Sequence, residues 1–170
     1  MKVANILYDS VVDGTGTRTV IFFQGCSIGC KGCHNPESHN KRCGHNYTPQ
    51  KLVKEICGKN FNNRITLSGG EPLEQKLDQL EEFICLFRKE CKKRGKRPDI
   101  WLYSGHHYTV TTLQENDIKY RIFKMCNVLV DGPFIIEQKK ELPFRGSENQ
   151  RIINLKRTFA TGKITLEKLR

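Results

Sequence analysis

The chain has 170 residues, of which 29 are Lys or Arg and 18 are Asp or Glu, so its formal charge is +11 at pH 7. This length suits one domain with its own core, and the first residues lack the basic and apolar regions of a secretory signal. Because no later run is apolar enough to span a membrane, we expect a single domain over residues 1–170, located in the cytoplasm, with no membrane partner.

The excess of positive charge predicts attraction to acidic partners. Its densest run, residues 89–97, falls at the end of an expected helix, where the helix dipole favours cations. No basic stripe is interleaved with aromatic residues of the kind that stack on bases. We therefore do not expect a nucleic-acid partner.

The first half of the chain predicts strands and one short helix. Two β-rich runs, residues 3–8 and 18–23, are separated by the turn-forming sequence DGTGT. Thr48 suits an N-cap and Pro49 the first helical position, which predicts a helix through about Cys57. A strand over residues 64–67 then leads directly into SGGEP.

The second half alternates helices and strands. Apolar residues recur at helical spacing from Leu77 to Cys91, and Gly95 suits the end of that helix. We also expect a helix over residues 117–125 and strands over residues 100–103, 128–130 and 152–155. This alternation predicts an α/β fold with mostly parallel strands, but it does not decide between an open sheet and part of a barrel.

The last residues, 156–170, have poor periodicity. Such a segment is either a flexible end or a docking segment.

Three of the eight cysteines, Cys26, Cys30 and Cys33, lie in one glycine-rich loop, QGCSIGCKGCHNPE. In a reducing cytosol this clustering indicates a metal site or catalysis more often than disulfides. Three thiolates would leave one iron of a 4Fe-4S cluster without a protein ligand, and an open coordination position can bind and activate a small molecule.

Two other sites remain open on these residues. A structural zinc site needs four ligands, and Cys43 or His45 is available as the fourth. A simple electron carrier needs a fourth cysteine on the cluster, for which Cys43 is again a candidate. Spacing favours the open cluster over zinc, and cysteines in helical segments are expected to be small buried hydrophobes: Cys57, Cys85 and Cys91.

The sequence SGGEP follows a predicted strand, where Gly69 and Gly70 allow a ligand to approach the backbone and Glu71 can hold an ammonium group. A plain turn is the alternative for this motif. His34, next to Cys33, is expected to border the site. No Ser-His-Asp or paired-carboxylate arrangement is recognisable.

Taken together, VDGTGTRTVIFFQGC, CSIGCKGCHNPE and TLSGGEPL resemble the radical S-adenosylmethionine superfamily, and within it the small activases of glycyl-radical enzymes. DIWLYSG, NVLVDGPF and FRGSENQR resemble the later blocks of the proteins that activate anaerobic ribonucleoside-triphosphate reductase. These blocks extend over most of residues 1–155. Pyruvate formate-lyase activase shares the early motifs but is longer, and it is the near alternative; a zinc-stabilised basic nucleic-acid-binding module is the alternative of another class.

The resemblance implies an incomplete β/α barrel with one 4Fe-4S cluster and S-adenosylmethionine as cofactors. By matching position, three irons would be ligated by Cys26, Cys30 and Cys33, and the fourth would be chelated by S-adenosylmethionine. Its adenine would lie beside Gly32, Cys33 and His34. Its methionine end would be held, mostly through backbone groups, by Gly69, Gly70 and Glu71.

The resemblance also implies the reaction. An electron from reduced flavodoxin or ferredoxin would cleave S-adenosylmethionine, and the 5′-deoxyadenosyl radical would take a hydrogen from a glycine near the C-terminus of the anaerobic reductase. The positive charge fits an acidic flavodoxin. Two positions depart from the pattern: Thr15 replaces a proline common in related activases, and Gly32 stands where much of the superfamily has an aromatic ring.

Overall fold

The computed structural model describes residues 1–58, 60–109 and 113–169. Within these ranges the main sheet has seven strands in the order β3-β1-β2-β4-β5-β6-β9. They are β1 (Lys2–Ser10), β2 (Arg18–Phe23), β3 (His45–Asn46), β4 (Arg64–Gly69), β5 (Asp99–Ser104), β6 (Val128–Asp131) and β9 (Arg151–Asn154). The central strands β2, β4, β5 and β6 are parallel to one another, whereas β1, β3 and β9 pair antiparallel with their neighbours.

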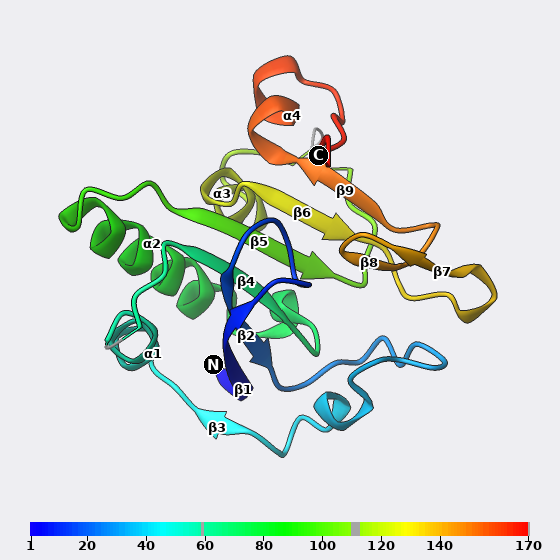
Figure 1. Cartoon of the computed structure of the whole chain (residues 1–170), viewed down its shortest axis with the longest axis horizontal. Helices are drawn as coiled ribbons and strands as arrows, with labels where there is room; N and C mark the ends of the chain where they lie inside the picture. Colours follow the sequence, from blue (N-terminus) through cyan, green and yellow to red (C-terminus); the bar gives the residue numbers. More distant parts are fainter. Residues whose placement is uncertain (59, 110–112, 170) are drawn as a thin grey trace.

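The α-helices are α1 (Pro49–Ile56), α2 (Leu77–Lys93), α3 (Ile118–Met125) and α4 (Leu155–Thr161), and the short 3₁₀ helices are η1 (Pro36–His39), η2 (Pro72–Glu74) and η4 (Ile136–Gln138). Figure 1 shows α1, α2 and α3 along one side of the sheet. Alternate strand residues point to opposite faces of a sheet. The main core accordingly joins these helices to every second strand residue, among them Ile21, Ile65, Leu67, Ile100 and Leu102.

A second, smaller cluster forms on the opposite face, around Trp101, Val130 and Ile152. A hairpin of β7 (Lys139–Leu142) and β8 (Arg145–Ser147) packs there through its turn residue Phe144. The Phe144 ring meets the Trp101 ring edge-on, with 5.4 Å between their centroids. This hairpin, which the sequence patterns did not predict, builds one wall of the pocket described below.

The expected helix boundaries are confirmed by their capping contacts. The Thr48 side chain accepts a hydrogen bond from the backbone N–H of Lys51, and Pro49 opens α1. Gly95 follows the end of α2 with φ of +65°, a conformation that glycine adopts without a steric penalty. Asp117 caps α3 through the backbone N–H of Lys119.

The α/β class and the mostly parallel sheet are confirmed. The described residues form no closed barrel, because β3 and β9 are the two edges of an open sheet. Both edge strands pair with a single neighbour within the sheet, in the antiparallel sense, so the parallel series stops at β2 and β6.

The end of the chain differs from the expectation. Leu155 begins α4 instead of closing the last strand, because Asn154 caps the helix through the backbone N–H of Arg157. Gly162 ends α4 with φ of +67° and the chain turns back. The backbone N–H of Asn154 then donates to Thr165 O at 2.8 Å, and that of Glu167 to Ile152 O at 2.7 Å. Residues 165–167 thus lie along β9, whereas a flexible or docking role for the segment 156–170 stays a prediction. Arg170 lies outside the described residues.

The turn DGTGT is fixed by a buried cation at the amino ends of the parallel strands. Arg18 is fully buried, and its guanidinium donates to Thr66 Oγ1 at 2.8 Å, Ile65 O at 2.8 Å and Asp99 Oδ2 at 3.0 Å. It also lies 5.3 Å from the centre of the Trp101 ring. A buried charge requires such compensation, and its partners join the starts of β2, β4 and β5.

Among the described residues, no helix is both long and apolar enough to cross a membrane.

Candidate functional site

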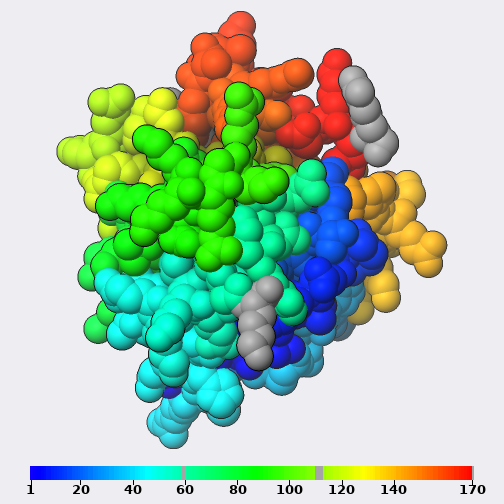
Figure 2. All heavy atoms as spheres, turned by 60° about the vertical axis from the view of Figure 1, so that its left-hand side comes forward, coloured from blue at the N-terminus to red at the C-terminus, as the bar shows by residue number. Residues whose placement is uncertain are grey.

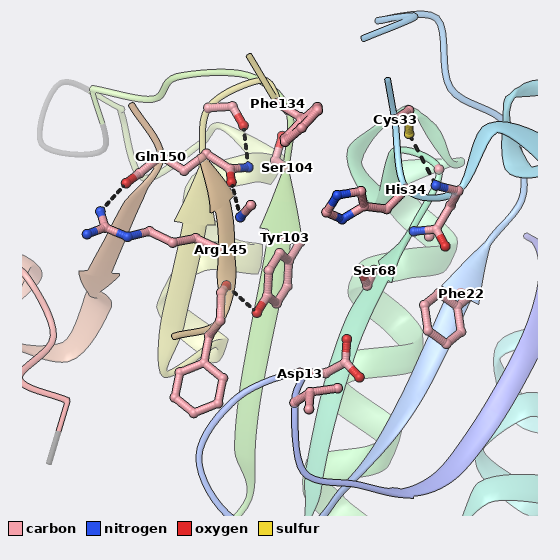
Figure 3. Close-up of a pocket in the computed structure, with 18 of the residues that line it drawn as sticks. Asp13, Phe22, Cys33, His34, Ser68, Tyr103, Ser104, Phe134, Arg145 and Gln150 are labelled. Carbon is pink, nitrogen blue, oxygen red and sulfur yellow. Dashed lines mark hydrogen bonds between the residues drawn. The ribbon is translucent and has the colours of Figure 1, made fainter. Parts of the chain in front are cut away.

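A pocket of about 560 Å³ opens on the face of the sheet opposite α1–α3. The carboxyl ends of the parallel strands supply its edge through Gly69, Ser104 and Gly132, and the loop after β2 supplies one wall through Cys33 and His34. Figure 3 shows this wall facing the β7–β8 side, where Phe134, Arg145 and Gln150 lie. Ligands commonly bind at the carboxyl ends of parallel strands in α/β proteins.

The cysteine loop, residues 25–33, has no regular secondary structure and is anchored at its start. The Gly25 N–H donates to Ser38 O at 2.7 Å, and Gly25 O accepts from the Glu71 N–H at 2.9 Å. Gly25, Gly29 and Gly32 have φ of +104°, +64° and +72°, conformations that other residues rarely adopt. The sequence therefore folds this segment into a tight loop directly beside the SGGEP turn.

The three cysteines of the loop are half-buried, and the sulfur atoms of Cys26 and Cys33 have backbone donors. Cys33 Sγ accepts from the Asn35 N–H at 3.4 Å. Burial raises the pKa of the Cys26 thiol, while hydrogen bonds from the backbone of Ile28 and Gly29 act in the opposite direction. N–H groups that point at a sulfur stabilise a thiolate and tune an iron–sulfur centre.

The described residues hold no group of three or more His, Cys, Asp or Glu side chains close enough to bind a single metal ion. Cys26, Cys30 and Cys33 thus share one loop without converging on one point, and Cys43 is exposed. The ligands of a cluster sit on separate irons and need not converge as those of one zinc ion do. The three half-buried thiols therefore share one tight loop, and their role as cluster ligands stays a prediction.

The paired glycines of SGGEP are required by close backbone packing. A Cβ on Gly69 would lie 2.5 Å from Phe23 N, and a Cβ on Gly70 would lie 2.4 Å from Gly25 O. Both glycines line the pocket. The turn after β4 and the cysteine loop therefore touch backbone to backbone at the pocket edge.

Glu71 is fully buried and does not line the pocket, although two residues that do, Ser104 and Gly105, hydrogen-bond to its carboxylate. It accepts hydrogen bonds from the Leu73 N–H at 3.0 Å, the Ser104 hydroxyl at 3.0 Å and the Gly105 N–H at 2.8 Å. Burial raises the pKa of Glu71, and these three hydrogen bonds oppose that shift. The side chain ties together the turns after β4 and β5, while its backbone supports the cysteine loop.

Of the site residues predicted from the sequence, the structure places Cys33, His34, Gly69 and Gly70 on the pocket wall. The others do not line the pocket: Cys26, Cys30, Gly32 and Glu71. A Cβ on Gly32 would lie 2.7 Å from Ile136 Cδ1, so the space beside this glycine is already filled.

Sequence reasoning missed several pocket residues. Asp13, from the DGTGT turn, lines the pocket and is held by the Ser10 hydroxyl at 2.5 Å. Tyr103, from β5, donates its hydroxyl to Phe144 O at 2.8 Å, and burial raises its pKa. No sequence pattern indicated that Asp13, in the turn before a strand, would line a pocket. Tyr103, in contrast, alternates with the buried Leu102, so it could have been assigned to the face of the sheet opposite the helices.

The remaining buried cysteines belong to the core. Burial raises the pKa of Cys57 to about 12, of Cys91 to about 11 and of Cys126 to about 12. Such thiols stay protonated at neutral pH and act as small apolar groups. Cys57 and Cys91 thus confirm the expectation of buried hydrophobes, whereas Cys85 is only half-buried.

Comparisons with known proteins give matches over most of the chain. A family model described as a 4Fe-4S single cluster domain matches residues 12–153. The chain is 36% identical over 146 residues to an anaerobic ribonucleoside-triphosphate reductase-activating protein of Vibrio cholerae, a match that covers 82% of this chain and 89% of that protein. Proteins of the same name from Enterobacteria phage T4 and Escherichia coli K12 are 35% and 32% identical, over 83% and 86% of this chain and 86% and 94% of theirs.

Proposed function

The chain belongs to the family of anaerobic ribonucleoside-triphosphate reductase-activating proteins, and from that premise we propose that its loop of Cys26, Cys30 and Cys33 serves to make a glycyl radical on the reductase. It is a radical S-adenosylmethionine activating enzyme with one 4Fe-4S cluster. The main support for assigning the cluster to this loop is the position of Cys33, which lies on the wall of a pocket of about 560 Å³ at the carboxyl ends of the parallel strands.

A reduced cluster held at this loop would supply one electron for cleavage of S-adenosylmethionine to methionine and a 5′-deoxyadenosyl radical, and this radical would take a hydrogen atom from a glycine of the reductase. Cys26, Cys30 and Cys33 would each ligate one iron through sulfur. Gly69 and Gly70 would present backbone groups to the methionine end. Glu71 would hold these backbone groups in place, because its carboxylate accepts hydrogen bonds from Ser104 and Gly105 in the neighbouring turn.

Part of the pocket wall is suited to a reactive radical, because the hydroxyl of Tyr103 is engaged elsewhere and several neighbours are apolar. The Tyr103 O–H bond is directed at Phe144 O, and its raised pKa keeps the phenol protonated. Phe22, Phe134 and Leu142 add apolar surface. Keeping water and alternative hydrogen donors away is what the protein must contribute to such chemistry.

The reductase would reach the pocket past an apolar rim. Leu7 and Val12 line the pocket and are 44% and 71% exposed, and the neighbouring Val11 is 66% exposed. Large apolar side chains gathered on a surface often mark an interaction site. Because a glycine of the reductase has to enter this pocket, we assign the Leu7–Val11–Val12 rim to contact with the reductase.

The electron donor in this proposal is reduced flavodoxin or ferredoxin. The charge of +11 supports an acidic protein partner through long-range attraction. The open sheet, in turn, is interpreted as the incomplete β/α barrel of the superfamily, and its ends at β3 and β9, which do not pair with each other, support that interpretation.

The test is formation of 5′-deoxyadenosine from S-adenosylmethionine by anaerobically reconstituted, dithionite-reduced protein. Adding anaerobic ribonucleoside-triphosphate reductase should give a glycyl-radical signal in electron paramagnetic resonance spectra. No 5′-deoxyadenosine from protein with a full complement of iron and sulfide would contradict the proposal. If 5′-deoxyadenosine forms but the glycyl radical appears on pyruvate formate-lyase and not on the reductase, the protein would instead be an activase of pyruvate formate-lyase.

A further inference from the structure

The adenine of S-adenosylmethionine needs a binding surface, and four aromatic side chains line the pocket: Phe22, Tyr103, Phe134 and Phe144. The one that packs against the cysteine loop is Phe134, whose ring centre lies 5.0 Å from that of His34 at an angle of 45°. On the hairpin side, the Tyr103 hydroxyl donates a hydrogen bond to Phe144 O, and the Phe144 ring packs against the Trp101 ring. Figure 3 shows the His34 ring pointing into the pocket from the loop, with Phe134 at the same end.

Two glycines make room for the Phe134 ring. A Cβ on Gly146 would lie 3.0 Å from Phe134 Cδ2 and 3.3 Å from His34 Cε1. A Cβ on Gly32 would lie 3.5 Å from Phe134 Cε1, and Ile136 fills the space closer to it. A Cβ at Gly146 would therefore press on the ring, whereas a Cβ at Gly32 would collide with Ile136 and only touch the ring. The absence of a side chain at Gly146, in the hairpin, leaves the space that the Phe134 ring occupies beside the cysteine loop.

The backbone that carries Phe134 is held firmly. Asn149 Nδ2 donates to Pro133 O at 2.8 Å, and Gln150 Nε2 donates to Gly132 O at 3.0 Å. Just before them, buried Asp131 pairs with Arg151 and accepts from the Tyr108 N–H at 2.8 Å. A ring on a fixed backbone is oriented before its ligand arrives, which limits the entropy lost on binding.

The geometry of the ligand selects Phe134. Resting on the proposed function, the sulfonium lies at the cluster, and one ribose separates it from adenine, so the base must lie near the cysteine loop. Position 32 in that loop offers no ring, whereas Phe134 offers one from the loop after β6. We propose that Phe134 is the surface on which the adenine of S-adenosylmethionine stacks, with His34 at its edge. Stacking on an aromatic side chain is worth roughly 1–3 kcal/mol per base.

The test compares two ligands that differ in the base. Binding of S-adenosylhomocysteine, which carries adenine, and of methionine, which does not, is measured by calorimetry on the cluster-loaded, full-length protein under anaerobic conditions. Phe134→Leu should weaken S-adenosylhomocysteine about tenfold, which corresponds to about 1.4 kcal/mol, and leave methionine within about twofold. Phe134→Tyr, which keeps the ring, should restore S-adenosylhomocysteine binding to within about twofold.

Phe61→Leu is the matched control, because Phe61 is a half-buried ring that packs under Arg94 away from the pocket. Iron content and thermal midpoint establish that each variant is folded and loaded, and Phe134→Met replaces Phe134→Leu if the latter loads less iron. Equal losses of affinity for both ligands would show that Phe134 only supports the pocket wall. No loss of affinity for either ligand would show that the base lies elsewhere. Either result would overturn this inference and leave the proposed function standing. Wild-type protein that binds no S-adenosylhomocysteine would overturn the proposed function, and this inference with it.

Discussion

The carboxylate of Glu71 accepts a 2.8 Å hydrogen bond from the backbone N–H of Gly105, which joins the turn after β4 to the turn after β5. Both turns stand at the edge of the pocket. The acidic residue of the GGE motif is thereby a structural tie in this protein, and the backbone groups of its glycines are the ones left to face a ligand.

Replacing Glu71 with Gln should lower the free energy of unfolding by about 1–3 kcal/mol. An amide cannot accept all three hydrogen bonds, so at least one buried donor loses its partner. For a chain of this size, the thermal midpoint should fall by roughly 2–4 °C for each kcal/mol. Glu137→Gln, at an exposed position of η4, is the control and should leave the midpoint unchanged. A Glu71→Gln midpoint equal to that of the wild type would contradict the structural role.

The advantage of the wild type over Glu71→Gln should shrink as pH rises. Burial raises the pKa of Glu71 above its ordinary value of 4.5, so the folded state holds this proton where the unfolded state has released it. The contribution is complete below about pH 4.5 and is lost as pH rises through the folded-state pKa. Thermal midpoints of both proteins from pH 5 to pH 8 test this. A difference that widens toward pH 8 would mean that the pKa is lowered instead.

Cys30→Ala should remove most of the bound iron and abolish 5′-deoxyadenosine formation, because an iron without its thiolate is not retained. Cys43→Ala is the matched control, since Cys43 is exposed and lies outside the loop. Iron and sulfide analysis after anaerobic reconstitution, together with chromatography of the product, measures both effects. Loss of the cluster in Cys43→Ala would instead indicate a fourth protein ligand and an electron carrier.

Gly70→Ala should disturb the cysteine loop without touching a cysteine. Its Cβ would lie 2.4 Å from Gly25 O, so the turn and the loop must separate. We expect iron content after reconstitution to fall several-fold. Gly95→Ala is the control, because a Cβ there would meet nothing within 4 Å; its φ of +65° adds backbone strain of about 1 kcal/mol, which Gly70→Ala does not. Full iron loading in Gly70→Ala would show that the contact is not needed.

Val11→Asp should reduce the yield of glycyl radical on the reductase by about five- to tenfold. A charge on the Leu7–Val11–Val12 rim would have to be desolvated when the reductase covers it. Leu166→Asp, at another exposed apolar position, serves as the control. The measurement is the radical signal per activase, normalised to 5′-deoxyadenosine formed without reductase. Equal reductions in both variants would argue against a contact at the rim.

Local signals accounted for most of the regular structure. Thr48 and Pro49 fixed the start of α1, and Gly95 fixed the end of α2, because caps act over a few residues. The hairpin around Phe144 escaped prediction, since its strands are short and rich in charge and do not alternate. Its stability comes from Trp101 and Tyr103, more than 40 residues earlier.

The candidate site was predictable in its ligand types but not in its orientation. Spacing identified Cys26, Cys30 and Cys33 as a group, and that identification stays a prediction. The direction of the Glu71 carboxylate depends on Gly105, 34 residues away, and no local pattern encodes it. The approach of Phe134 to His34 likewise requires β6 to lie within reach of the cysteine loop.

The last residues of the chain have a consequence for the outer strand of the sheet. β9 pairs with β6 on one side, and on the other its Ile153 pairs with Leu166 in an isolated bridge. An unpaired strand edge is a template for association with other copies, and natural proteins cover such edges. Residues 165–167 cover the edge of β9. A chain cut after Gly162 would therefore expose β9 to self-association, although it would keep every residue that lines the pocket.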